Sequence, residues 1–445
     1  MTMITRSLVL LGFVSLAACG ETKMTGLTTE TMFEVQIENV SAVYDFPASG
    51  LFATPAGQGA PGPLLPGGVY EFDFDAFPGA KLSFATMFVQ SNDLFLAPSG
   101  SGIDLFDATG GPITGDVTSQ IMIWDAGTEI DQEPGSGLDQ APRQGGANTG
   151  AADPDGTVRL ADDTFGNLPA VSDVVTVTLD STGPSSFRLR IENVSMDGTV
   201  TTMGGAMLPA PLAPGVWVVH TADDPIFTSG SADRGEGLEA LAEDGDASVL
   251  AAELIARTGL SSPIAPGVFA AHAVPSVLFE AGMAATGELE ALAEDGDPSG
   301  LAAAVGIAMG VFESGAFDTP VGAGGPAPAG PGEVYEFTFT ADVGDRLSFA
   351  SMLVQTNDLF LAPAEGGIDL FPGGSALSGD VTGMVLLWDA GTEVNQAPGF
   401  GLDQAPRQSG PDTGMAEGGV VGQVSDGYQY PRVSDVIRVT IQPIG

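Results

Sequence analysis

Three acidic residues recur in the second half of the chain with the same neighbours and almost the same spacing. They are Asp93, Asp125 and Glu129 in the first copy, and Asp358, Asp389 and Glu393 in the second. A duplicated fold needs only its apolar pattern to be kept, so repeated carboxylates point to a repeated site. Carboxylate oxygens are the ligands that hard cations such as Ca²⁺ prefer. The repeat therefore predicts one calcium site in each copy.

The surrounding sequence indicates how these carboxylates could meet. Asp125 and Glu129 follow the apolar strand expected at 121–124, and Gly127 between them permits a positive φ. Asp93 follows the strand expected at 81–89. If the two strands are neighbours in one sheet, the three carboxylates meet at one end and repel one another unless a cation is bound. The alternative is that Asp93 and Asp125 cap loops by accepting hydrogen bonds from backbone amides while Glu129 is solvated.

The elements that carry these residues read as short strands without intervening helices, which is typical of an antiparallel β-sandwich. The segment 33–40 alternates apolar and polar residues, as expected of a strand at a sheet edge, and its echo is 187–194. We therefore predict a mainly β chain with two tandem antiparallel sandwiches, at 32–181 and 186–445. The second would contain a small α/β insert at about 205–312.

The expected insert is itself duplicated. Residues 213–220 match 265–272, and residues 238–246 match 289–297. Each unit reads as a strand followed by two Ala/Leu-rich helical turns that break at a glycine. The acidic runs 243–246 and 294–297 lack the ligand spacing of an EF-hand and are interpreted as solvated helix breaks.

The N-terminus predicts export. Residues 1–18 have one positive charge and a short apolar run, as in a signal peptide, and Leu16-Ala17-Ala18-Cys19 resembles the bacterial lipobox. Cys19 is the single cysteine, so the expected chain is acylated there and contains no disulfide bond. Residues 19–31 would be a tether. Gly20 after the cysteine favours the outer membrane or cell surface, and the lipid is the expected membrane contact.

The charge of the chain limits its partners. Lys and Arg total 13 against 57 Asp and Glu, a net charge of −44, which excludes nucleic-acid binding. Arg143 and Arg407, each near an aspartate in a repeated segment, predict loop-fixing ion pairs. His220 and His272, at equivalent strand ends without further His or Cys nearby, predict buried structural histidines.

The motifs Ser91-Asn92-Asp93-Leu94-Phe95 and Trp124-Asp125-Ala126-Gly127-Thr128-Glu129 resemble the spondin domain of F-spondin-like matrix proteins, in a bacterial form. The resemblance implies a β-sandwich similar to calcium-dependent phospholipid-binding domains, with one calcium ion in the end loops. The implied ligands are the six repeated acidic residues. The chain departs from the animal domains in using Glu129 and Glu393 where Asp is usual, Leu94 and Leu359 where an aromatic residue is common, and no loop cysteines.

These observations predict a non-enzymatic, lipid-anchored envelope protein that binds calcium and serves adhesion to an extracellular protein or glycan. Nucleophile and phosphate-binding motifs are not found in the sequence. Two alternatives remain: a secreted enzyme acting on polysaccharide with structural calcium, since a glycosidase needs only two carboxylates, and a metal-free scaffold.

Overall fold

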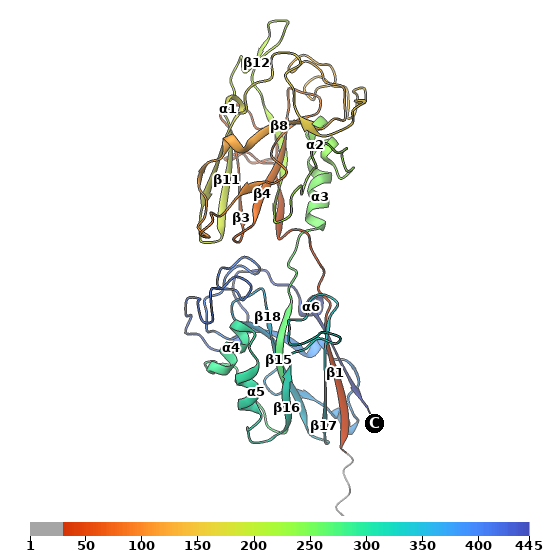
Figure 1. Cartoon of the computed structure of the whole chain (residues 1–445), viewed down its shortest axis with the longest axis vertical. Helices are drawn as coiled ribbons and strands as arrows, with labels where there is room; N and C mark the ends of the chain where they lie inside the picture. Colours follow the sequence, from red (N-terminus) through yellow and green to blue (C-terminus); the bar gives the residue numbers. More distant parts are fainter. Residues whose placement is uncertain (1–29, 445) are drawn as a thin grey trace, which may run out of the picture.

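The computed structural model describes residues 30–444, and antiparallel strands outnumber helices among its regular elements. The predicted mainly β class with antiparallel sheets is confirmed. The predicted signal peptide, Cys19 and nearly all of the tether lie outside the described residues. Figure 1 shows two bodies placed end to end, joined by two passes of the chain. We call residues 46–258 the inserted domain, and residues 31–41 with 262–444 the host domain.

The inserted domain contains two facing sheets. The larger has the order β2-β14-β4-β5-β8-β9, with β6 also paired to β4: β2 (Ala48–Phe52), β14 (Leu212–His220), β4 (Lys81–Phe88), β5 (Leu94–Pro98), β8 (Ile121–Asp125), β9 (Arg159–Leu160) and β6 (Ile103–Asp104). The smaller has the order β3-β11-β10-β7: β3 (Val69–Asp75), β11 (Ser186–Asn193), β10 (Val175–Ser181) and β7 (Gly115–Asp116). The remaining elements are the hairpin β12 (Val200–Thr201) and β13 (Met207–Leu208), with α1 (Val171–Val174), α2 (Leu238–Asp244) and α3 (Ser248–Ala256).

The host domain repeats this arrangement. Its larger sheet has the order β16-β15-β18-β19-β22-β23, with β20 also paired to β18: β16 (Val311–Phe317), β15 (Ile264–His272), β18 (Arg346–Leu353), β19 (Leu359–Pro363), β22 (Val385–Asp389), β23 (Gly422–Gln423) and β20 (Ile368–Asp369). Its smaller sheet has the order β17-β1-β24-β21: β17 (Val334–Ala341), β1 (Thr31–Asn39), β24 (Ile437–Pro443) and β21 (Gly379–Asp380). The helices are α4 (Gly287–Asp295), α5 (Ser299–Val305) and α6 (Val433–Val436).

Period-2 alternation builds the core of each sandwich. In β1 the apolar residues Phe33, Val35 and Ile37 are buried, while the polar residues between them are more exposed. Side chains from both sheets of a domain share one apolar core. A second apolar cluster lies on the other face of each larger sheet, where α2 and α3, or α4 and α5, cover the strands that carry the acidic motifs (Figure 1).

The predicted division of the chain differs from the one in the structure. The expected edge strand at 33–40 is β1, and it lies between β17 and β24 in the interior of a host-domain sheet, not in the predicted domain 32–181. The echo strand β11 instead joins β3 and β10 of the inserted domain. The expected insert at 205–312 is likewise divided: β14, α2 and α3 complete the inserted domain, whereas β15, α4 and α5 complete the host domain. An alternating strand fixes which of its faces is buried, but not which neighbours it pairs with.

Two equivalent asparagines mark the position at which the inserted domain interrupts the host domain. In the inserted domain, Asn193 closes β11 by donating hydrogen bonds from Nδ2 to the carbonyls of Leu64 and Ala210, both at 2.9 Å. Asn39 ends β1 in the same way, with Nδ2 3.0 Å from the carbonyl oxygen of Ser262. From Asn193 to Ala210 the chain forms only the β12–β13 hairpin, whereas from Asn39 to Ser262, the equivalent segment of the host domain, it forms the entire inserted domain. The chain is therefore one sandwich placed in a hairpin position of another.

Candidate cation sites in the end loops

Asp93 and Asp125 lie at adjacent strand ends, at the same end of the larger sheet of the inserted domain. Asp93 immediately precedes β5 and Asp125 ends β8, and these strands are paired in register, with Leu94 opposite Asp125. Because the strands are antiparallel, the start of one and the end of the other coincide. The predicted adjacency of these two carboxylates is therefore confirmed.

Asp93 is fully buried. Its Oδ2 atom accepts hydrogen bonds from the backbone N–H groups of Thr128 and Glu129, both at 3.1 Å. Its Oδ1 atom has no hydrogen-bond partner among residues 30–444. Burial, followed by the charge of Asp125, raises the pKa of Asp93 to about 8. A buried carboxylate with one unsatisfied oxygen is costly, so the site favours either a proton or a cation there.

Asp125 is fixed by its own turn and by an arginine. Its Oδ1 atom accepts a hydrogen bond from the N–H of Gly127 at 2.6 Å, and its Oδ2 atom forms an ion pair with Arg159. Gly127 has φ 68°, and a Cβ atom there would collide with the backbone of Thr157. Burial raises the pKa of Asp125, while the Gly127 hydrogen bond and the Arg159 charge oppose the rise. Gly127 therefore adopts the positive φ that the sequence predicts for this turn.

The third carboxylate of this cluster is Asp131, which the sequence did not single out. One oxygen from each of Asp93, Asp125 and Asp131 lies within 4.8 Å of the others. A calcium ion with ligands at roughly 2.3 to 2.6 Å can hold oxygens up to about 5 Å apart, so the spacing fits. Burial and the charge of Asp125 raise the pKa of Asp131 to about 6. Asp131 does not recur, because the second copy has Asn395 at this position, so the repeat gives no signal for it.

Glu129 does not join this cluster, contrary to the prediction that all three repeated acids meet. It is buried, and its Oε1 atom accepts a hydrogen bond from the N–H of Gly150 at 2.5 Å. Glu393 does the same with Gly414 at 2.6 Å and also accepts from Nδ2 of Asn357 at 3.1 Å. A Cβ atom at Gly150 or Gly414 would overlap the carboxylate. In each domain this glutamate therefore holds a loop that is distant in sequence, at Gly150 or Gly414, against the strand ends.

The host domain has an equivalent cluster. Asp358 is fully buried, and its Oδ2 atom accepts hydrogen bonds from the N–H groups of Thr392 at 2.8 Å and Glu393 at 3.1 Å. Its Oδ1 atom has no partner within the described chain. Asp358, Asp389 and Glu417 bring one oxygen each within 4.8 Å of one another. Burial, then the charge of Asp389, raises the pKa of Asp358 to about 6.

The two clusters differ in their compensating groups. Arg159 of β9, which also pairs with Asp153 at 2.6 Å, has Gly422 of β23 as its counterpart. In the host domain, Asp389 instead accepts a hydrogen bond from Nδ2 of Asn395 at 2.8 Å. A guanidinium neutralises part of the inserted-domain cluster, whereas a neutral amide does not. Both clusters therefore keep an excess of negative charge, but only the inserted-domain cluster contains a guanidinium among its carboxylates.

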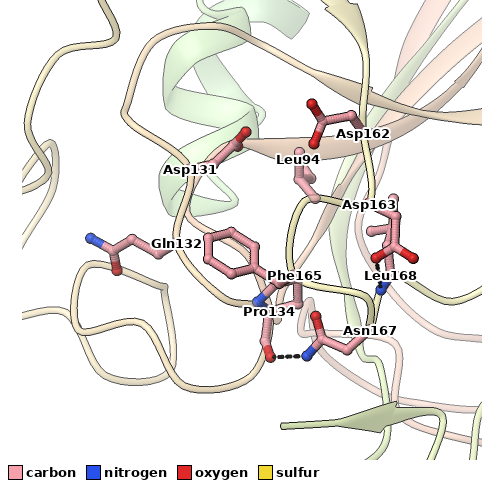
Figure 2. A pocket seen from close by; sticks show the side chains of 9 residues that line it. All are labelled: Leu94, Asp131, Gln132, Pro134, Asp162, Asp163, Phe165, Asn167 and Leu168. Atoms are coloured by element: carbon pink, nitrogen blue, oxygen red, sulfur yellow. Dashed lines mark hydrogen bonds between the residues drawn. The ribbon is translucent and has the colours of Figure 1, made fainter. Parts of the chain in front are cut away.

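A small pocket borders the inserted-domain cluster. Figure 2 shows Asp131 and Asp162 at one side of it, with Leu94 between them and Phe165 below. A hydrogen bond from Asn167 to the carbonyl of Pro134, at 3.0 Å, closes the opposite side. The cavity volume of about 10 Å³ is near that of one water molecule. This pocket is too small for a sugar ring.

The remaining predicted residues are structural. His220 is buried, with Nδ1 2.6 Å from the carbonyl of Ala222 and Nε2 2.9 Å from Oγ of Ser83, and His272 makes the two equivalent contacts in the host domain. Arg143 does fix its loop, but not through the predicted ion pair: its Nε donates to the carbonyl of Gly137 at 2.8 Å. Arg407 likewise uses a backbone carbonyl.

A scan against protein-family models and a search of curated proteins found no match to this chain. The resemblance to the spondin domain thus stays a prediction. Over residues 30–444, no helix has both the length and the apolar character needed to cross a membrane.

Proposed function

We propose that the chain is a non-enzymatic, exported, lipid-anchored envelope protein with one calcium ion in the end loops of each domain, serving adhesion or another extracellular interaction. The observation that supports the calcium sites best is the burial of Asp93 in the inserted domain and of Asp358 in the host domain. Each keeps one carboxylate oxygen without a hydrogen-bond partner among the described residues, inside a group of three acidic side chains. A divalent cation would satisfy that oxygen and remove the mutual repulsion.

The ligands in this proposal differ in part from those inferred from the resemblance. Asp93, Asp125 and Asp131 would bind the ion in the inserted domain, and Asp358, Asp389 and Glu417 in the host domain. Backbone carbonyls and water would complete the six to eight oxygens that calcium takes. Bound calcium would connect the strand ends to the long loops and so hold that end of each sandwich in one shape.

The adhesion function rests on the resemblance to matrix proteins and on this loop geometry. A cation that orders end loops prepares a rigid surface, which lowers the entropic cost of binding a partner. The expected partner is an extracellular protein or glycan, since the net charge of −44 repels nucleic acid. The lipid on Cys19 would be the membrane contact.

Thermal unfolding of residues 20–445 tests the calcium sites. The parent is compared in EDTA, millimolar calcium and millimolar magnesium with the double variant Asp125→Asn, Asp389→Asn. Calcium at about a hundred times its dissociation constant should stabilise a domain by roughly 2.7 kcal/mol, a shift of several degrees. If neither the parent nor the variant responds to calcium, the result favours the metal-free scaffold, in which the aspartates only cap turns; an equal rise in both proteins would show that calcium binds at other residues.

A further inference from the structure

Glu294, at the end of α4, is buried although the sequence predicts a solvated helix break. Its side chain is 1% exposed, and its Oε1 atom lacks a hydrogen-bond partner anywhere in residues 30–444. Glu290 precedes it by four residues and therefore lies on the same face of α4. Burying an unsatisfied carboxylate costs free energy, so this position favours either a proton or a bound cation.

A third carboxylate comes from a distant loop. Asp412 places an oxygen within 4.8 Å of oxygens from Glu290 and Glu294. The loop is tied to the same helix by Gln408, whose Nε2 donates to Oδ1 of Asp295 at 2.8 Å. Glu294 is buried, Glu290 is half-buried and Asp412 is exposed, so water can complete the coordination from the open side.

Within residues 30–444, these three acidic residues have no basic partner. None of the ion pairs found among the described residues includes Glu290, Glu294 or Asp412. Three carboxylates at this spacing without a neutralising charge repel one another. A compact cation of charge +2 with a preference for oxygen is the ligand that matches them.

The inserted domain has the same construction with one changed residue. Its helix α2 carries Glu239 and Glu243, and Asn148 occupies the position of Asp412. Asn148 donates a hydrogen bond from Nδ2 to Oε1 of Glu239 at 2.6 Å. The amide thus replaces the third carboxylate and satisfies one of the remaining two.

We propose that the host domain holds a second calcium-class site, formed by Glu290 and Glu294 of α4 and by Asp412, and that Asn148 removes this site from the inserted domain. The bound ion clamps the loop at 408–414 onto the helix. The site is additional to the Asp358 cluster because it uses different carboxylates, although the charge of Asp358 also acts on Glu294.

Calcium stoichiometry by equilibrium dialysis tests this assignment with two reciprocal variants of residues 20–445. Asp412→Asn should bind one calcium ion fewer per chain than the parent, and Asn148→Asp should bind one more. Positions 412 and 148 have φ values of 53° and 50°, a region that Asn and Asp both tolerate, so both variants should fold. Circular dichroism melting in EDTA checks this directly.

The outcome is separable from that of the end-loop sites. Asp389→Asn alters the Asp358 cluster alone, so Asp412→Asn combined with it should lose a further ion. If Asp412→Asn binds as many calcium ions as the parent at every concentration, the second site does not exist. Should Asp412→Asn misfold, Asn148→Asp decides alone: a gained ion supports the site and an unchanged count overturns it.

Discussion

Truncation of Phe33 in β1 tests the exchange of strands between the two domains. Phe33 is fully buried, stacks on Phe339 with ring centroids 5.6 Å apart and meets Phe371 edge-on at 5.5 Å. Because all of these contacts belong to the host domain, Phe33→Ala should lower the free energy of unfolding of that domain by about 3–5 kcal/mol. Each 1.4 kcal/mol corresponds to a factor of ten, so amide exchange through global opening should accelerate by about a hundredfold or more.

The matched control is Phe187→Ala in the echo strand β11. Phe187 is equally buried and stacks on Phe74 at 5.6 Å, with Phe106 edge-on at 5.2 Å. Hydrogen exchange with mass spectrometry should show faster exchange in β17 and β24 for Phe33→Ala, and in β3 and β10 for Phe187→Ala. Faster exchange in β3 and β10 for Phe33→Ala would refute the placement of β1 and return it to the domain predicted from sequence.

Three further predictions concern the acidic loops. Arg159→Ala removes the guanidinium of the inserted-domain cluster, so the thermal shift caused by calcium should exceed that of the parent; an unchanged shift would show that the arginine does not compete with the ion. Gly414→Ala should cost about 1–3 kcal/mol in urea unfolding because its Cβ overlaps Glu393, whereas Gly410→Ala, with open space around it, should be neutral. Burial, with smaller contributions from neighbouring charges, raises the pKa of Glu243 to about 7, so its neutral form favours the fold and this stability is lost as the pH rises from about 4.5 through 7. In EDTA, Glu243→Gln should therefore gain up to about 3 kcal/mol relative to the parent between pH 4.5 and 8 in urea unfolding, and parallel pH profiles would contradict this.

The sequence predicts the strands well because their burial follows a simple period. The alternation at 33–40 appears in the structure as β1, with Phe33, Val35 and Ile37 facing the core. The adjacency of Asp93 and Asp125 was also predictable, since both lie at strand ends that an antiparallel pairing brings together. These features depend on neighbours along the chain or on one strand pair.

The domain assignment of β1 was not predictable in the same way. Strands β1 and β11 have closely similar alternating sequences, and each could pair with the partners of the other. The two strands differ only in which of two nearly identical sheets they join, and this depends on the length and path of the connecting segments. An internal repeat conceals this choice, because it makes the wrong pairing as regular as the right one.

The repeat also explains which site residues were found and which were missed. The six acids that recur in the end-loop motifs, such as Asp93 and Asp125, all accept hydrogen bonds from backbone N–H groups. They fix loops that both domains need, so recurrence alone identifies a loop-fixing function as readily as a ligand. The residues that set the charge of each cluster are those that differ: Asp131 and Arg159 in the inserted domain correspond to Asn395 and Gly422 in the host domain. Positions at which the two domains carry different residues therefore indicate, better than identical positions, where their affinities for a cation differ. The same reasoning identifies Asn148 and Asp412, which lie beside α2 and α4.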